Sequence, residues 1–459
     1  MKKLWIALLA LALLAGFALN ASALDVHFSG QYYVMGIYDD NPSLKDKNNQ
    51  TIGAQAFYTQ RLRLNATFQV AEGLALKIER LDILEKKWGD LSWTATNETL
   101  NRREGTWTGP TATGPRTQEN VEFERAYMDF TTKIGRFLIG YQNQTAWGTD
   151  FGNSDVTHAG ITYLVPVGPM ILVAKIEKKK DSNSGSTPLG AGITSNSSTT
   201  DADADIYDLA AIYKFGAGEA GLLWQYVRNN ATRQLNYYAS FHVFDPYVKV
   251  KLGPVYVEAE GAWATGDAAK FEGPLATLPT VKVDALGLFV HARGDFGPAY
   301  AGLQFAWVRG DDPDTTDKIE GSFMATLGAG SSYDPALILW NDDMNTLIGN
   351  RVGYASVPTS TFVDNVWMYR VYAGFKPVPK ADIQLSVLHA YADKKPSAAY
   401  ISTTYGTEVD LVATYKIFDN LEYKIGAGYL FTGDYYKGTS SSNKIENDFL
   451  LLHKLTLTF

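Results

Sequence analysis

The sequence predicts an all-β fold, a transmembrane antiparallel up-and-down β-barrel, on the basis of three observations. In the final segment, residues 447–459, Phe449, Leu451 and Leu455 fall on one face, whereas Asp448 and Lys454 fall on the other. Similar alternating segments recur along the chain and are joined by short turns. Aromatic residues make up 13% of the chain although its mean hydropathy is only -0.15. This combination is typical of a barrel, because its apolar surface occupies alternate residues and its rims are rich in aromatic side chains.

The N-terminus predicts a cleaved secretory signal peptide, residues 1–23. Lys2 and Lys3 precede an apolar run over residues 4–19, and Ala21 and Ala23 form a small-x-small cleavage site. The run is shorter than the roughly 20 residues that a membrane-spanning helix requires, so an uncleaved anchor is the weaker interpretation. We therefore expect residues 24–459 to form one transmembrane β-barrel domain.

The composition narrows the function classes. Asp and Glu number 49 against 41 Lys and Arg, which gives a net charge of -8 and disfavours nucleic acid as a partner. The chain has no cysteine, which excludes disulfides, thiolate metal sites, haem attached through cysteine and a lipid anchor on cysteine. We expect no cofactor, and we expect stability to come from strand pairing and packing alone.

The alternating segments number eighteen, to within about two, so the prediction is a barrel of about 18 strands (16–18). The predicted strands are residues 26–38, 57–70, 74–88, 121–130, 135–146, 161–167, 171–179, 206–215, 220–227, 235–252, 255–263, 283–293, 298–307, 365–375, 383–391, 409–418, 421–431 and 447–459. An even number places both termini on the periplasmic side and the long connections outside the cell. The longest connection is residues 310–362.

Two strands contain an irregularity. Within residues 74–88 the alternation slips between Ile78 and Leu81, which predicts a β-bulge. Within residues 235–252 the apolar parity changes at Asp245-Pro246, and a proline inside a strand usually marks a bulge or an edge. We predict a bulge there too.

The alternation also predicts which charged residues line the lumen. A sheet that spans lipid must close on itself, so its apolar face points outward and its polar face inward. The predicted pore-lining residues are Arg61, Arg63, Lys77, Glu79, Arg136, Lys249, Lys251, Glu258, Glu260, Arg293, Arg370, Glu408 and Asp410. Charges of both signs need water, and eighteen strands leave room for an aqueous channel. For any single residue the simpler interpretation is an ordinary solvated wall charge.

As a group these charges suggest selectivity. Arg61, Arg63 and Arg136 lie on neighbouring strands and could form a basic ladder that faces acids such as Glu258, Glu260 and Asp410. Such opposed rows of charge would orient small polar or charged solutes at a constriction.

Signals for metal binding and catalysis are weak. Asp311, Asp312 and Asp314 could bind a divalent cation, although acidic loops are usually only solvated. The six histidines lack the spacing of a zinc site, and no nucleophile motif is present. We therefore predict that the protein is not an enzyme.

Two features carry a family resemblance. The last strand and its terminal Phe459 resemble the strand that the barrel-assembly machinery recognises in outer-membrane barrels. Residues 136–148 resemble a motif of alginate-export-like and related outer-membrane channels. The mature chain thus resembles a Gram-negative outer-membrane porin of the deltaproteobacterial type, with a looser resemblance to eighteen-stranded specific channels and alginate-export channels. The mixed charge of the predicted wall argues against polysaccharide export.

The resemblance implies passive diffusion of small polar or charged solutes across the cell outer membrane, with loop 310–362 narrowing the lumen. It implies contact with outer-membrane lipid and lipopolysaccharide, and it leaves a homotrimer open. Two other functions stay open as well. The barrel could be a sleeve around an electron-transfer or export partner, which co-purified haem would reveal, or it could be an enzyme of the outer rim, which a hydrolase assay would reveal.

Overall fold

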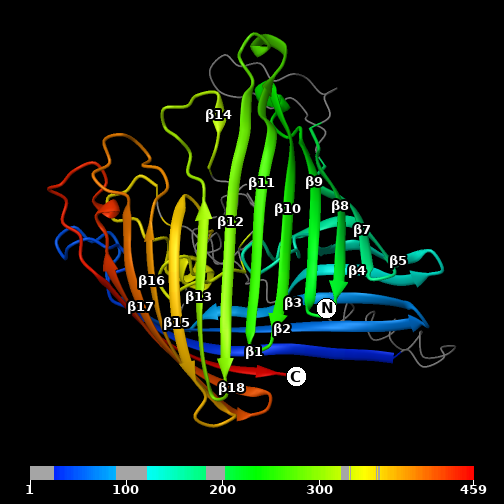
Figure 1. Ribbon diagram of the computed structural model, residues 1–459, viewed down its shortest axis with the longest axis horizontal. Coiled ribbons are helices and arrows are strands. Elements are labelled where there is room, and N and C mark those ends of the chain that lie inside the picture. The colour runs from blue at the N-terminus through cyan, green and yellow to red at the C-terminus, as the bar shows by residue number, and fades with distance from the viewer. Residues whose placement is uncertain are drawn as a thin grey trace, which may run out of the picture.

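The computed structural model describes residues 25–88, 121–181, 202–321, 330, 332–357, 359 and 362–459. The predicted signal peptide, residues 1–23, lies outside the described residues. Within them, strands dominate and helices are few and short (Figure 1).

Eighteen long strands form one closed antiparallel barrel in the described part of the chain, which confirms the predicted fold. These strands are β1 (Asp25–Asp39), β2 (Gln55–Ala71), β3 (Leu74–Lys87), β4 (Val121–Thr132), β5 (Gly135–Asn143), β6 (Thr157–Val167), β7 (Met170–Lys180), β8 (Ala204–Phe215), β9 (Gly218–Asn229), β10 (Tyr237–Leu252), β11 (Val255–Phe271), β12 (Val281–Phe296), β13 (Ala299–Val308), β15 (Val366–Phe375), β16 (Ala381–Tyr391), β17 (Thr404–Phe418), β18 (Leu421–Thr432) and β19 (Asp448–Thr458).

Pairing of the first strand with the last one closes the barrel. β1 pairs with β2 on one side and with β19 on the other, in a register that sets Gln31 opposite Thr458 and Asp39 opposite Leu450. Every other long strand pairs with its sequence neighbours, and β13 pairs with β15. The short strand β14 (Lys318–Ile319) lies in the connection between them and adds to β12 in parallel. Among the eighteen long strands described, no barrel edge is therefore left unpaired.

The two ends of the barrel differ in their connections. At one end short turns join the strands and both described ends of the chain lie there; Gly168 and Gly253 supply the positive φ that two of these turns require. The opposite end carries the long connections, which include α4 (Asp342–Leu347) and the 3₁₀-helices η1 (Arg233–Leu235), η2 (Gly273–Leu275) and η3 (Asp434–Lys437). Among the described residues, none of the helices has the length and apolar character needed to cross a membrane.

Side-chain burial alternates along the strands, with large apolar side chains on the outer face and charged side chains on the inner face, the reverse of a soluble protein. Large apolar side chains such as Phe28, Leu385 and Phe459 project from the outer surface, where they are 67%, 51% and 53% exposed. Charged side chains such as Arg61 and Glu408 point inward and are buried. An apolar exterior around a polar interior is the arrangement that lipid outside and water inside require.

One of the two predicted bulges is confirmed and the other is wrong. In β3 the register shifts where Ile78 pairs with Ala66, and Arg80 adopts a left-handed φ of 57°. At Asp245-Pro246 the register of β10 runs without a shift against both neighbouring strands. The apolar parity changes there because the inward side chains before this point, Phe241 and Val243, join a buried apolar cluster inside the lumen, not because the strand is interrupted.

Candidate pore constriction

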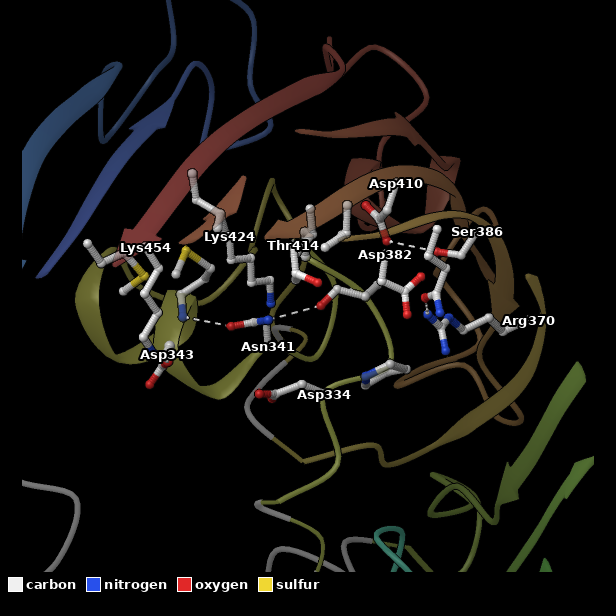
Figure 2. Close-up of a pocket in the computed structure, with 18 of the residues that line it drawn as sticks. Asp334, Asn341, Asp343, Arg370, Asp382, Ser386, Asp410, Thr414, Lys424 and Lys454 are labelled. Atoms are coloured by element: carbon white, nitrogen blue, oxygen red, sulfur yellow. Dashed lines mark hydrogen bonds and ion pairs between the residues drawn. The ribbon is translucent and has the colours of Figure 1, made fainter. Parts of the chain in front are cut away.

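The long connection between β13 and β15 folds into the barrel. Its residues Leu337, Ile338, Leu339 and Trp340 are between 0% and 6% exposed. Asn341 follows and caps α4, because its side-chain oxygen accepts a hydrogen bond from the backbone N–H of Met344 at 3.0 Å. Figure 2 shows this segment against the inner wall of the barrel. The sequence prediction that loop 310–362 narrows the lumen therefore has a structural basis.

Glu408 of β17 anchors this loop. The carboxylate accepts hydrogen bonds from the backbone N–H groups of Leu337 at 2.9 Å, Ile338 at 2.6 Å and Leu339 at 2.9 Å. The side chain is fully buried. Three donors converging on one buried carboxylate fix the path of the loop, because each N–H would otherwise lose its partner in a site closed to water. Glu408 was predicted to line the pore, and the structure gives it this structural role instead.

Arg351 anchors the same loop at the seam between the first and last strands. Its guanidinium donates to Asp448 of β19 at 3.0 Å, to Asp39 of β1, and to the carbonyl of Gly349 at 3.1 Å. Arg351, Asp39 and Asp448 are all buried. The charge pattern of the individual strands could not reveal this contact, because the three residues are far apart in the sequence.

A second connection, residues 144–156 between β5 and β6, also enters the lumen. Glu260 of β11 accepts hydrogen bonds from the backbone N–H of Thr149 at 2.8 Å and of Gly152 at 3.3 Å, and from the Thr149 hydroxyl. Phe151 is fully buried and stacks on Phe289 of β12, with ring centroids 5.1 Å apart. Sequence reasoning missed this loop. Gly148 was a usable signal, because a side chain there would collide with the Glu260 carboxylate.

The two inward loops contact each other. The backbone N–H groups of Gly330 and Ser332 donate to the carbonyl of Asn153 at 3.2 and 3.4 Å. Tyr333 also packs edge-on against Phe151, with ring centroids 6.0 Å apart. Because both loops are tied to the wall and to each other, they form one constriction of the lumen.

Arg61 and Arg63 line the wall of β2, where they pair with acids of adjacent strands. Both contact Asp82 of β3, with an Arg63 Nε to Asp82 distance of 2.7 Å, and both lie 3.6 Å from Glu124 of β4. The predicted ladder that faces Glu258, Glu260 and Asp410 is therefore replaced by pairing between neighbouring strands.

Two further arginines extend this cluster. Arg80 contacts Glu124 at 2.9 Å, and both Arg80 and Arg125 contact Asp155 of the 144–156 loop. Burial alone would raise the pKa of Asp155, but the hydrogen bond from Arg125 and the charge of Arg80 outweigh it and lower the pKa. Sequence reasoning missed Arg80 because the bulge in β3 shifts its position in the alternation.

Closer to the short turns, the predicted residues form smaller clusters. Asp129 accepts from Lys77 at 3.0 Å and from Arg136 at 2.6 Å. Glu79 accepts a hydrogen bond from the Tyr127 hydroxyl at 2.7 Å. These residues lie on β3, β4 and β5, so the structure brings Lys77 and Arg136 together at Asp129 and pairs Glu79 with Tyr127.

On the opposite part of the wall, Glu258 contacts a histidine. His291 Nδ1 lies 2.9 Å from Glu258, and its Nε2 lies 2.7 Å from the Tyr372 hydroxyl. Arg293 pairs with Asp295 at 2.9 Å. Glu258, His291 and Arg293 therefore each have a hydrogen-bond or ion-pair partner on the barrel wall.

Aromatic rings hold several lumen cations against the wall. Arg293 lies 3.9 Å from the centroid of the Tyr300 ring, and Lys454 lies 3.9 Å from that of Tyr33. Lys249 lies 5.4 Å from the ring centroid of Tyr247, and Lys251 lies beyond it near the strand end. These contacts keep the positive charge close to the wall of the barrel.

The weak metal candidates receive no support. Within the described ranges no group of three or more histidine or acidic residues is arranged to hold a metal ion. Asp311 accepts the backbone N–H of Glu320 at 2.8 Å, and Asp312 accepts from Lys394 at 2.8 Å. These acids are engaged in organising the loop.

No family model and no curated protein sequence matches the chain. Solved structures do. The chain is similar to Pseudomonas aeruginosa OccK11 (OpdR), with a TM-score of 0.51 and 10% identity over 95% of this chain and 96% of that one. It is also similar to the outer membrane protein opdK of Pseudomonas aeruginosa, with a TM-score of 0.50 and 12% identity over 94% and 99% of the two chains. For Pseudomonas aeruginosa OpdO the TM-score is 0.50 and the identity 10%, over 95% and 98%.

These similarities extend over nearly the whole of each chain, so they concern the complete barrel. The fold is therefore that of a closed antiparallel eighteen-stranded β-barrel, as in the outer membrane protein opdK. At such low identity the likeness concerns the fold alone, and the function has to be argued from the residues of this chain.

Proposed function

We propose that this protein is a porin, a channel for the passive diffusion of small polar or charged solutes. The observation that carries the proposal is the constriction. Two inward loops meet inside a closed barrel, and the wall around them carries charges of both signs, such as Arg63, Asp82 and Glu124. A charged wall of this kind requires water, and a loop constriction sets the size and charge of what passes.

The proposed location is the outer membrane of a Gram-negative cell. The broad apolar exterior needs lipid, so outer-membrane lipid and lipopolysaccharide are the proposed surroundings. The signal peptide, the periplasmic placement of both termini and recognition of Phe459 by the barrel-assembly machinery belong to the same proposal. So do a deltaproteobacterial type of porin and a homotrimer, for which the sequence resemblance is the support.

The porin proposal fits the described lumen better than a sleeve does. A sleeve must leave its interior open to a partner protein, whereas the lumen here contains two of the chain's own loops, tied down at Glu260 and Glu408. A rim enzyme finds no specific observation in its favour among the described residues.

Planar-bilayer recordings of the purified protein test the proposal. We expect stepwise ohmic currents in salt solution, and tiny or absent steps would contradict a porin. In a salt gradient, Arg61→Ala together with Arg63→Ala should shift the reversal potential towards cations, because the variant keeps Asp82 and Glu124 while losing two positive charges. Lys133→Gln, in the short turn between β4 and β5, serves as the matched control and should behave as the wild type.

A further inference from the structure

A cavity of about 280 Å³ lies between the β13–β15 loop and the inner wall. Figure 2 shows it, with Asn341 and Asp343 of the loop on one side and side chains of β15 to β19 on the other. Its volume is at the lower limit of the roughly 300–1,000 Å³ of pockets that hold drug-sized ligands. The cavity therefore suits a small solute.

Lys424 of β18 supplies a positive charge that no described acid neutralises. Its register partner on β19 is Lys454, so two ammonium groups stand on directly opposed positions of the same inward face. Like charges in directly opposed positions repel. Lys454 has the Tyr33 ring at 3.9 Å and Asp343 at 3.9 Å, whereas no ion pair within the described chain joins Lys424 to a carboxylate.

Arg370 of β15 supplies a second positive charge to the same cavity. Its two terminal nitrogens donate to the amide oxygens of Gln304 at 3.0 Å and Gln384 at 3.1 Å. Both acceptors are neutral, and the buried Nε atom has no hydrogen-bond partner among the described residues. The guanidinium is held in place by neutral acceptors, and the nearby acid on which its charge acts is Asp410.

Carboxylates in the cavity also lack strong cationic partners. Asp382 accepts the Tyr300 hydroxyl at 2.7 Å, but its nearest cation, Lys376, is 3.9 Å away. Asp410 is 3% exposed, its Oδ2 accepts from Ser386 at 3.4 Å and its Oδ1 lacks a hydrogen-bond donor within the described chain, but this carboxyl lies beside the buried Glu408 carboxyl and is acted on by the charge of Arg370. A buried oxygen without a donor is costly, and a ligand that donates to it would remove that cost.

We infer that this cavity binds a small zwitterion, a solute that carries one carboxylate and one ammonium group, of which an α-amino acid is the simplest kind. The ligand carboxylate meets Lys424 and the ligand ammonium meets Asp382, while Arg370 and Asp410 complete the lining of the cavity (Figure 2). A simple anion would leave Asp382 without a close cation, a simple cation would leave Lys424 without an anion, and a neutral polyol would satisfy neither charge. The inference rests on the proposed function, since it names the solute class of that channel.

Calorimetry on the detergent-solubilised protein tests the inference without relying on current. The probes are glutamine, which is zwitterionic, its single-charge analogues N-acetylglutamine and glutaminamide, and glucose as the neutral polyol. We expect glutamine to bind at least about tenfold more tightly than each of the other three, because only glutamine pairs with both sets of charges. Equal affinity for glutamine and either single-charge analogue would overturn the inference.

Two substitutions locate the site. Lys424→Gln and Asp382→Asn should each raise the glutamine Kd about tenfold. Lys424→Gln should also remove the preference for glutamine over glutaminamide, and Asp382→Asn the preference for glutamine over N-acetylglutamine. Lys133→Gln should leave the Kd unchanged, and bilayer current steps show that each variant is folded. Wild-type affinity in both cavity variants would overturn the inference. Glutamine-selective binding without wild-type current steps would refute the porin proposal alone, whereas current steps without selective binding would refute this inference alone.

Discussion

Replacement of Arg351 by methionine tests whether the inward loop stabilises barrel closure. Arg351 is fully buried and joins Asp39 at the end of β1 to Asp448 at the start of β19. Arg351→Met keeps a long side chain but leaves two buried carboxylates without their cation. Removal of one partner of a buried ion pair costs about 3–5 kcal/mol, and the repulsion between the two acids adds to this loss.

The assay is urea unfolding of the barrel in lipid vesicles, followed by tryptophan fluorescence. We expect Arg351→Met to lower the free energy of unfolding by at least about 3 kcal/mol. Lys282→Met is the matched control, because Lys282 pairs with Asp267 at 2.6 Å with a side chain that is 57% exposed. Exposed pairs contribute about 0–1 kcal/mol, so the control should change little.

A triple variant separates charge from packing. Arg351→Met combined with Asp39→Asn and Asp448→Asn removes the buried charges together, and it should recover most of the stability that the single variant loses. A single variant within about 1 kcal/mol of the wild type would refute the reasoning. So would a triple variant that is no more stable than the single one, because the loss would then come from packing.

Three further predictions follow from the constriction. Glu408→Gln should lower the free energy of unfolding by about 2 kcal/mol or more, because the amide cannot accept from all three loop N–H groups. The released loop should also increase the single-channel conductance. The control Glu422→Gln on β18 should keep the wild-type conductance. Phe151→Ala should lower the free energy of unfolding by about 3–5 kcal/mol in urea titrations, and a loss below about 1 kcal/mol would show that the 144–156 loop is not packed as described. The hydrogen bond from Lys394 lowers the pKa of Asp312 from its usual 3.8, so a carbon NMR titration of Asp312 should give a midpoint below that value. The ion pair therefore stabilises the loop above the unfolded pKa, and this stabilisation is lost as the pH falls through the folded pKa. A titration midpoint at or above 3.8 would contradict the prediction.

The strand β10 shows where sequence reasoning fails. The parity of its apolar residues changes at Asp245-Pro246, and the strand nevertheless continues in register. Phe241 and Val243 point inward and join the buried apolar cluster, because the chain's own loops fill that half of the lumen. The inward face of β10 is therefore apolar where it meets the inward loops and basic nearer the short turns, at Lys249 and Lys251, and a local pattern cannot tell this change from a bulge.

The candidate site was predictable in part. The alternation predicts that Arg61, Arg63 and Glu408 lie on the inner face, because a period of two fixes the side of each residue. It could not find Arg80, since the bulge in β3 breaks the period, nor the role of Glu408, whose partners are backbone groups of a distant loop.

The sequence by itself determined that the chain is a closed barrel with an apolar exterior, because lipid on one side and water on the other act on successive residues of every strand. Only the tertiary structure decided what fills the lumen and which charges pair. Those contacts join residues far apart in the chain, as in the 312 positions that separate Arg351 from Asp39. No local pattern specifies such a pair, because it forms only after the barrel has closed and the loop has folded inward.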